Sequence, residues 1–179
     1  MNFMVITETK LKGAFVIELD KFKDARGFFA CAWSDREFAA TGLTTSFVEL
    51  NIAFNEKKGT LRGIHYQLPP NDQVKLVRCT RGSIYDVIID LRRSSPTFKQ
   101  WLAVEMSADN RRMLYVPGEF AHGYLTLADD TEVFYQTSSY YAPEHGRGVR
   151  WNDPAFKISW PADPLVMIDR DRNYEDFAS

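Results

Sequence analysis

The chain has 179 residues, a length that suits one domain. Its formal net charge of −2 lacks the excess of basic residues expected of a nucleic-acid-binding protein. Two cysteines, Cys31 and Cys79, are too few for a disulfide-stabilised secreted scaffold, so we expect both to be reduced thiols. No stretch is long and apolar enough to cross a bilayer, and the first residues lack the basic and apolar regions of a signal peptide. These features predict a cytoplasmic protein with a single domain over residues 1–179, without nucleic-acid or membrane partners.

Short runs rich in β-forming residues, separated by turn signals, follow one another along most of the chain. We expect strands over residues 13–19, 45–53, 61–67, 74–79, 83–91, 101–106, 113–116, 124–127 and 132–138. Helix is scarce: residues 34–41 favour one short helix with Ser34 as its N-cap and Gly42 at its end, and the tail after Leu165 has room for another helical turn. Many short strands at this spacing predict a β-sandwich or a closed barrel.

The first candidate site lies on the strand expected over residues 61–67. Histidine changes charge near neutral pH and suits the removal of a proton from carbon, and the chain has only three histidines. Strict alternation along this strand would place His65 and Gln67 on one face and Arg62 on the other. Inside a barrel, the face with His65 would form a polar pocket. The alternative is a core histidine with a satisfied hydrogen bond.

Three further groups of polar residues are candidates. Gln73 and Lys75 share a face of the next strand, where a lysine inside a barrel needs a carboxylate or an anionic ligand; the alternative is a solvated edge strand. Tyr135 and Tyr141 offer phenols that can donate a proton or stack, or simply pack. The charged run at residues 169–172 either forms a solvated face or supplies a carboxylate that orients His65.

Metal and cofactor chemistry are not expected from the motifs present. A barrel metal site with two histidines and a carboxylate needs a second histidine beside His65, and position 67 is glutamine. The sequence contains no GxGxxG or GxxxxGK[ST] phosphate loop and no GxSxG nucleophile elbow.

Six motifs, taken together and in this order, resemble the dTDP-4-keto-6-deoxyglucose (dTDP-4-dehydrorhamnose) 3,5-epimerase family. They are residues 61–67 (LRGIHYQ), 75–78 (KLVR), 86–92 (DVIIDLR), 95–98 (SPTF), 120–124 (FAHGY) and 151–154 (WNDP). Any one motif is weak evidence, but the resemblance runs from Asp24 to Asp171. It implies an all-β fold, namely a cupin-type jelly-roll barrel with a few short helices.

The resemblance also implies an activity, a site and an assembly. The activity would be epimerisation at C3, C5 or both of a nucleotide-diphosphate-linked 4-keto-6-deoxyhexose, for example in the synthesis of surface polysaccharide, without a metal or redox cofactor. The residues that align with the family's catalytic groups are His65 as base, Asp171 as its partner, Tyr135 as acid and Lys75 beside the enolate oxygen. The substrate contacts fall on Arg26, Phe29, Glu49, Asn51, Arg62, Gln73, His122, Tyr141 and Arg170. The family implies a homodimer with an exchanged N-terminal segment, which would carry Arg26 and Phe29 to the neighbour's site.

Four positions depart from the family pattern. Cys31 and Gly146 stand where glutamate is usual, Glu49 where glutamine is usual, and Gln136 where lysine is usual. Since several of these family positions contact the nucleotide, the departures predict a weaker preference for dTDP and leave open a CDP- or GDP-linked sugar. Three further functions also stay open: a mono-epimerase, a non-catalytic sugar-nucleotide-binding cupin and a metal-dependent cupin oxygenase.

Overall fold

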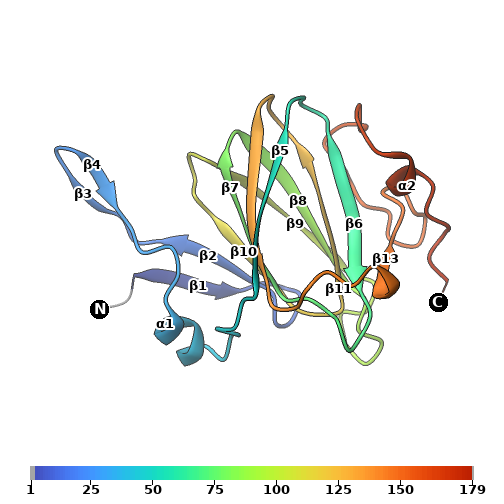
Figure 1. The fold of residues 1–179 in the computed structure, drawn as a ribbon, viewed down its shortest axis with the longest axis horizontal. Coiled ribbons are helices and arrows are strands. Elements are labelled where there is room, and N and C mark those ends of the chain that lie inside the picture. The colour runs from blue at the N-terminus through green and yellow to red at the C-terminus, as the bar shows by residue number, and fades with distance from the viewer. Residues whose placement is uncertain (1–2, 179) are drawn as a thin grey trace.

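Residues 3–178, which the computed structural model describes, form two antiparallel β-sheets with short helices at the periphery (Figure 1). The first sheet has six strands in the order β1 (Met4–Glu8), β2 (Phe15–Leu19), β10 (Met113–Val116), β7 (Lys75–Arg81), β12 (Thr131–Thr137) and β5 (Glu49–Asn55). The second has five, in the order β13 (Gly146–Gly148), β6 (Leu61–Gln67), β11 (Phe120–Thr126), β8 (Ser83–Asp90) and β9 (Trp101–Ser107). Outside these sheets lie the hairpin β3 (Phe22–Asp24) and β4 (Gly27–Phe29), the helices α1 (Asp35–Ala40) and α2 (Asp169–Arg172), and the 3-10 turn η1 (Pro143–His145). The expected all-β fold is confirmed.

The main core lies between the two sheets because each sheet turns apolar side chains toward the other. Val77 of β7 and both Ile84 and Ile88 of β8 are fully buried in one cluster. β8 lies between β11 and β9 and is apolar along most of its length, except for Asp86 and Asp90, which have no exposed surface. Buried carboxylates need partners, and each of these two organises a different part of the molecule.

All nine strands expected from the sequence are present, with ends shifted by a few residues. The largest shift at a strand start is four residues: β5 begins at Glu49 instead of residue 45, and β11 begins at Phe120 instead of residue 124. The strands that the sequence did not predict are β1, β3, β4 and β13, which are only three to five residues long. Such short segments carry too little alternation to be recognised, and their pairing depends on neighbours brought together by the fold. The helical turn expected after Leu165 is confirmed as α2.

Helix α1 occupies the expected place and Ser34 is its N-cap, as predicted, but no capping box forms. The backbone of Ser34 is extended as an N-cap requires, yet its side chain makes no capping hydrogen bond. The carboxylate of Glu37 turns away from the helix and accepts hydrogen bonds from the backbone N–H groups of Phe3 (2.9 Å) and Met4 (3.1 Å). Glu37 therefore fastens α1 to the start of β1, a tertiary contact that the local pattern could not reveal.

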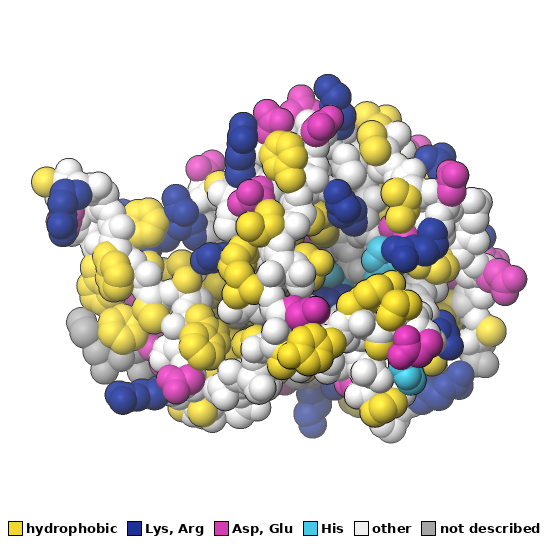
Figure 2. Space-filling model, viewed as in Figure 1, with side chains coloured by type: hydrophobic (Ala, Val, Ile, Leu, Met, Phe, Trp, Pro, Cys, Tyr) yellow, Lys and Arg dark blue, Asp and Glu magenta, His cyan; other side chains and the backbone are white. Residues whose placement is uncertain are grey.

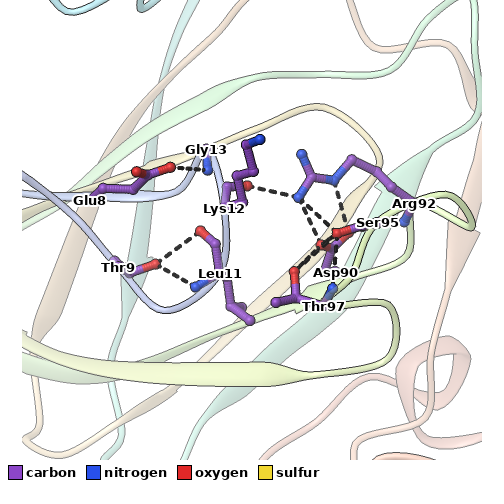
Figure 3. Close-up of polar contacts among 9 residues, drawn as sticks. All are labelled: Glu8, Thr9, Leu11, Lys12, Gly13, Asp90, Arg92, Ser95 and Thr97. Atoms are coloured by element: carbon purple, nitrogen blue, oxygen red, sulfur yellow. Dashed lines mark hydrogen bonds and ion pairs between the residues drawn. The ribbon is translucent and has the colours of Figure 1, made fainter.

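A polar network closes the end of β8 (Figure 3). Asp90 accepts hydrogen bonds from Nε (2.9 Å) and Nη2 (2.7 Å) of Arg92, from Oγ of Ser95 (2.5 Å) and from Oγ1 of Thr97 (2.6 Å). Nη2 of Arg92 also donates to the backbone carbonyl of Lys12 (2.7 Å), which joins this network to the turn between β1 and β2. Burial alone would raise the pKa of Asp90, but these hydrogen bonds lower it to about 2.

Replacing Asp90 with asparagine is expected to lower the free energy of unfolding at pH 7 by about 2–4 kcal/mol, because the Arg92 guanidinium loses its buried carboxylate. The folded-state pKa lies below that of the unfolded chain, so the stabilisation is present above the unfolded value and is lost as pH falls toward 2. The difference between the parent protein and Asp90→Asn should therefore shrink below pH 4. Denaturant titrations at several pH values measure it.

Asp24→Asn is the matched control, since Asp24 is an exposed aspartate that also pairs with an arginine. Exposed ion pairs contribute little, so Asp24→Asn should change the free energy of unfolding far less than Asp90→Asn does at pH 7. A difference for Asp90→Asn that stays constant from pH 7 to pH 3 would contradict the role assigned to its charge.

Candidate active site

A cavity of about 560 Å³ opens between the two sheets and is closed on one side by the C-terminal segment. Its walls come from β6, β7, β11 and β12 and from the segments around η1 and α2. Nine of the thirteen site residues predicted from the sequence line it: Arg62, His65, Gln73, Lys75, His122, Tyr135, Tyr141, Arg170 and Asp171. The fold thus brings together residues that are up to 109 positions apart in the sequence, from Arg62 to Asp171 (171 − 62 = 109).

His65 and Asp171 form a hydrogen-bonded pair at one wall. Nε2 of His65 lies 2.7 Å from Oδ1 of Asp171, and Oδ2 of Asp171 accepts a hydrogen bond from the backbone N–H of Gly63 (3.1 Å). Burial raises the pKa of Asp171, but the hydrogen bond and charge of His65 outweigh it, with help from Gly63 and Arg170, and hold that pKa below its usual value. An ionised Asp171 accepts a hydrogen bond from the Nε2–H group, so in the neutral imidazole Nδ1 of His65 carries no proton and can accept one.

The structure corrects the expected alternation of β6, because Arg62 and His65 both line the cavity. In the pairing of β6 with β11, His65 lies opposite His122 and Arg62 lies opposite Tyr124. Three steps along β6 therefore match two steps along β11, which is a β-bulge. The extra residue reverses the alternation between Arg62 and His65, and both side chains reach the same space.

Glycine makes this bulge possible. Gly63 has a φ of +118°, and a Cβ added to it would lie 2.6 Å from the Cα of Gly123 on β11. A side chain at position 63 would therefore collide with backbone that cannot move aside, in a backbone conformation that only glycine adopts easily. Ile64, the other residue of the bulge, is fully buried in a separate cluster with Val149 and Phe156.

Lys75 and His122 project into the cavity from β7 and β11 and share one buried carboxylate, Asp86. Nε2 of His122 lies 2.9 and 3.0 Å from the two carboxylate oxygens of Asp86. Burial lowers the pKa of Lys75 to about 8, although the charge of Asp86 acts in the opposite direction. Asp86 was not predicted from the sequence to belong to the site. The available signal was an aspartate inside the apolar run of β8, where a carboxylate must have a partner.

Tyr135 lies on β12, in the sheet opposite His65, and is half-buried. Burial raises its pKa; the nearby charge of Arg62 lowers it and that of Glu49 raises it further. The phenol therefore keeps its proton at neutral pH and can donate it. Because β12 and β6 belong to different sheets, Tyr135 and His65 approach the cavity from different walls.

Four predicted contacts do not line the cavity of this chain: Arg26, Phe29, Glu49 and Asn51. Arg26 and Phe29 lie on the β3–β4 hairpin, which projects from the body on the side away from α2 (Figure 1). Arg26 is exposed and pairs with Asp24 at 2.6 Å, and the side chain of Phe29 is 68% exposed. Glu49 and Asn51 lie on the edge strand β5, where Asn51 is the backbone partner of Tyr135.

The four departures from the family pattern lie in different places. Gly146 lines the cavity, whereas Gln136 lines a separate hollow of about 140 Å³ beside Trp33. Cys31 donates its Sγ–H to the backbone carbonyl of Trp33 (3.1 Å), and it is a free thiol, as expected. Glu49 is close enough to Tyr135 for its charge to act on the phenol.

Several lining residues were not predicted from the sequence: Tyr66, Tyr124, Arg147 and Tyr174. Gln67, which we expected on the His65 face, lines the wall but uses its amide for structure. Its Nε2 donates to the carbonyls of Asn71 (2.6 Å) and Tyr140 (3.2 Å), and its Oε1 accepts from the backbone N–H of Ala142 (2.8 Å). Gln67 thereby fixes the segment that carries Tyr141 at the rim.

Among residues 3–178, no group of three or more histidine, cysteine, aspartate or glutamate side chains is placed to hold a metal ion. Over the same part of the chain, no helix is long and apolar enough to cross a membrane.

Comparisons with known proteins agree with the fold and the site. A family model described as dTDP-4-dehydrorhamnose 3,5-epimerase matches residues 8–179. The dTDP-4-dehydrorhamnose 3,5-epimerase of Shigella flexneri is 40% identical over 175 residues, which cover 97% of this chain and 96% of that protein.

Two solved structures extend the comparison. The dTDP-4-dehydrorhamnose 3,5-epimerase of Bacillus anthracis, with TDP and PPi bound, superposes with a TM-score of 0.94 at 42% identity and covers 97% of this chain and 99% of that chain. A Legionella pneumophila dTDP-6-deoxy-D-glucose-3,5-epimerase in complex with dTDP-4-keto-L-rhamnose superposes with a TM-score of 0.87 at 35% identity, covering 94% and 89%. These similarities confirm the cupin-type jelly-roll fold.

Proposed function

The chain belongs to the dTDP-4-dehydrorhamnose 3,5-epimerase family, and from this premise we propose that it inverts C3 and C5 of a dTDP-linked 4-keto-6-deoxyhexose. The observation that carries the proposal is the His65–Asp171 pair, which faces Lys75 and Tyr135 across one cavity. The substrate ketone acidifies the neighbouring C–H bonds, so a base, a cation and an acid placed around one carbon are the groups that such a reaction needs.

In the proposed reaction, Nδ1 of His65 takes the proton from the carbon next to the ketone. The electron pair of the broken C–H bond moves to form an enolate, whose oxygen is stabilised by the ammonium of Lys75 together with His122. Asp171 stays ionised and stabilises the imidazolium that forms. The phenol of Tyr135 then returns a proton to carbon from the opposite face, the enolate collapses to the ketone, and the centre is inverted.

The charges at the cavity support binding of a diphosphate. Guanidinium groups fit phosphate oxygens well, and Arg62 and Arg170 both line the cavity. Arg62 is held in place because its Nε donates to Oδ1 of Asn55 (2.7 Å) and its Nη2 to the carbonyl of Phe54 (3.1 Å). Tyr141 is 61% exposed at the rim, a position that suits stacking on a base.

The exposed apolar face of the first sheet supports a homodimer. On the edge strand β5, three alternating residues are largely exposed: Leu50 (59%), Ile52 (64%) and Phe54 (45%). Figure 2 shows that hydrophobic side chains gather on the half of the molecule that carries β1 to β5. Edge strands with such a surface are usually covered, and a second copy would cover this one. In that assembly the β3–β4 hairpin would bring Arg26 and Phe29 to the partner's cavity.

Incubation of the protein with dTDP-4-keto-6-deoxyglucose in deuterated water tests the function. Proton NMR should show exchange at both C3 and C5 and inversion of both centres, and the rate should survive dialysis against a strong chelator. Exchange at one centre would make the protein a mono-epimerase. Exchange only with the CDP- or GDP-linked sugar would mean that the departures at Cys31, Glu49 and Gly146 have changed the nucleotide. No exchange with any of the three substrates would overturn the proposal.

The charge of Lys75 predicts an alkaline limit to the reaction. Because the pKa of Lys75 is about 8, the ammonium loses its proton above this pH, and the exchange rate should fall there. Lys75→Arg keeps a positive charge throughout this range, so this variant should be slower at pH 7 but show no decline between pH 8 and pH 9.5. Initial exchange rates, corrected for a blank without protein, measure both profiles. The same decline in parent and variant would contradict the assignment.

A further inference from the structure

Tyr174 lies against the proposed base, three residues after Asp171 in the C-terminal segment. The ring of Tyr174 is half-buried, lines the cavity and meets the imidazole of His65 edge to face, with the ring centroids 6.1 Å apart and an interplanar angle of 75°. His65 is therefore contacted from two sides by the same segment, by the carboxylate of Asp171 at Nε2 and by the ring of Tyr174.

A glycine on β13 makes room for this ring. Gly148 is the residue of β13 that lies directly opposite His65 in the ladder with β6. A Cβ added to Gly148 would overlap the Cζ, Cε2 and Cδ2 atoms of Tyr174. The ring thus occupies the space that a side chain at position 148 would fill, beside His65 on the same sheet. Gly148 does not have a positive φ, so alanine can adopt its backbone conformation, and only the ring stands in the way.

The segment that carries Tyr174 is anchored beyond it as well. The backbone N–H of Phe177 donates to Oδ2 of Asp153 (2.6 Å), and the ring of Phe177 packs against Phe156 with the centroids 5.2 Å apart. Arg150 forms an ion pair with Asp176. Because the chain is fixed both at Asp171 and at Phe177, the ring between them is held in its place.

We propose that Tyr174 is a positioning residue, whose ring holds the imidazole of His65 in the orientation that joins Nε2 to Asp171 and presents Nδ1 to the substrate. The proposal rests on the proposed function of the same cavity. The polar contacts of the imidazole, with Oδ1 of Asp171 (2.7 Å) and Nη2 of Arg170 (3.4 Å), both lie at Nε2 and leave the ring free to tilt about that atom; the edge-to-face neighbour removes this freedom. The role belongs to the ring and not to the hydroxyl, since it is the ring carbons that lie over Gly148.

Four variants separate the ring from the hydroxyl and from the segment. Tyr174→Phe keeps the ring and should exchange deuterium at a near-parental rate. Tyr174→Ala removes the ring. Gly148→Ala keeps the tyrosine in the chain but places a methyl group in the space that its ring occupies. Each variant should lower kcat by roughly 10–100-fold with little change in KM. Glu175→Ala, an exposed neighbour on the same segment, should have no effect. Circular dichroism and Tm show that each variant is folded.

NMR of the imidazole signals gives a readout that does not depend on activity. The chain has three histidines, and the signal missing from His65→Gln identifies His65. Its resonances should move in Tyr174→Ala and in Gly148→Ala but stay close to the parental positions in Tyr174→Phe. Parental kcat and unmoved resonances in both alanine variants, or a loss in Tyr174→Phe as large as in Tyr174→Ala, would overturn the proposal. A parent protein that exchanges no substrate would instead refute the proposed function, and the resonances would still decide whether Tyr174 holds the imidazole.

Discussion

Replacing His65 with alanine is expected to abolish both deuterium uptake and inversion, because the imidazole is the group proposed to take the proton from carbon. General bases typically contribute about 10²–10⁴-fold, so the loss should be plain in a simple exchange assay. The side chain of His65 is one-third exposed and its main fixed contacts are Asp171 and Tyr174, so the fold should tolerate its removal. Exchange rates at C3 and C5, followed by NMR in deuterated water, measure the effect.

Asp171→Asn tests whether the carboxylate assists the base. Asparagine keeps the size of the side chain but cannot stabilise the imidazolium, so both exchange and inversion should become slower without ending. His145→Ala is the control for histidine loss, since His145 lies outside the cavity on η1 and pairs only loosely with Glu144 at 4.0 Å. A near-normal exchange rate in His65→Ala would show that another group is the base.

Replacing Tyr135 with phenylalanine is expected to separate exchange from inversion. The variant keeps the aromatic ring on β12 but loses the proton that is delivered from the far face. His65 should still remove the substrate proton, exchange it with solvent and return deuterium to the same face. The sugar should therefore take up deuterium while its configuration stays largely unchanged, with inversion slower by about 10²–10⁴-fold.

Tyr115→Phe serves as the matched control for this result. Tyr115 is buried in the cluster beneath α1, away from the cavity, and its hydroxyl accepts a hydrogen bond from the backbone N–H of Thr44 (3.2 Å). Its loss should change stability slightly and leave both exchange and inversion intact. If Tyr135→Phe inverts its substrate as fast as the parent protein, the acid lies elsewhere and the assignment is wrong.

Nine strands of the two sheets could be predicted because each of them has a clear pattern of its own, which the short strands β1 and β13 lack. The strands with long alternating or apolar runs, such as β8 and β12, were found within a few residues of their true ends. The prediction that Arg62 and His65 lie on opposite faces of β6 was wrong because of the bulge at Gly63. This bulge depends on how closely β11 approaches β6, which is a property of the folded sheet. The capping box of α1 is absent for a similar reason, because Glu37 bonds to the start of β1 and not to its own helix.

Most of the cavity could be located through motif resemblance, whereas its supporting residues could not. Asp86 lies in a motif that assigned it no place in the site, and Tyr174 lies in no motif; their importance comes from what they touch, namely His122 and His65. Arg26 and Phe29 differ from these two residues, since the resemblance named them but they do not line the cavity of this chain. Their placement on a projecting hairpin means that one chain alone does not assemble every predicted contact.

The proposed base and its carboxylate come from parts of the chain that are 106 residues apart, and this separation has a consequence for how activity is lost. The last strand of the two sheets, β13, ends at Gly148, and the segment that carries Asp171 follows it in the chain. That segment contributes one short helix and is held to the barrel by an isolated bridge of Val166 with Thr60 and by the contacts of Asp171 and Phe177, without a strand ladder of its own, so we expect it to open at a lower free energy than the two sheets. Mild denaturant or heat should therefore abolish activity while the two sheets stay folded. Removing the denaturant or cooling the sample should restore activity without refolding of the sheets.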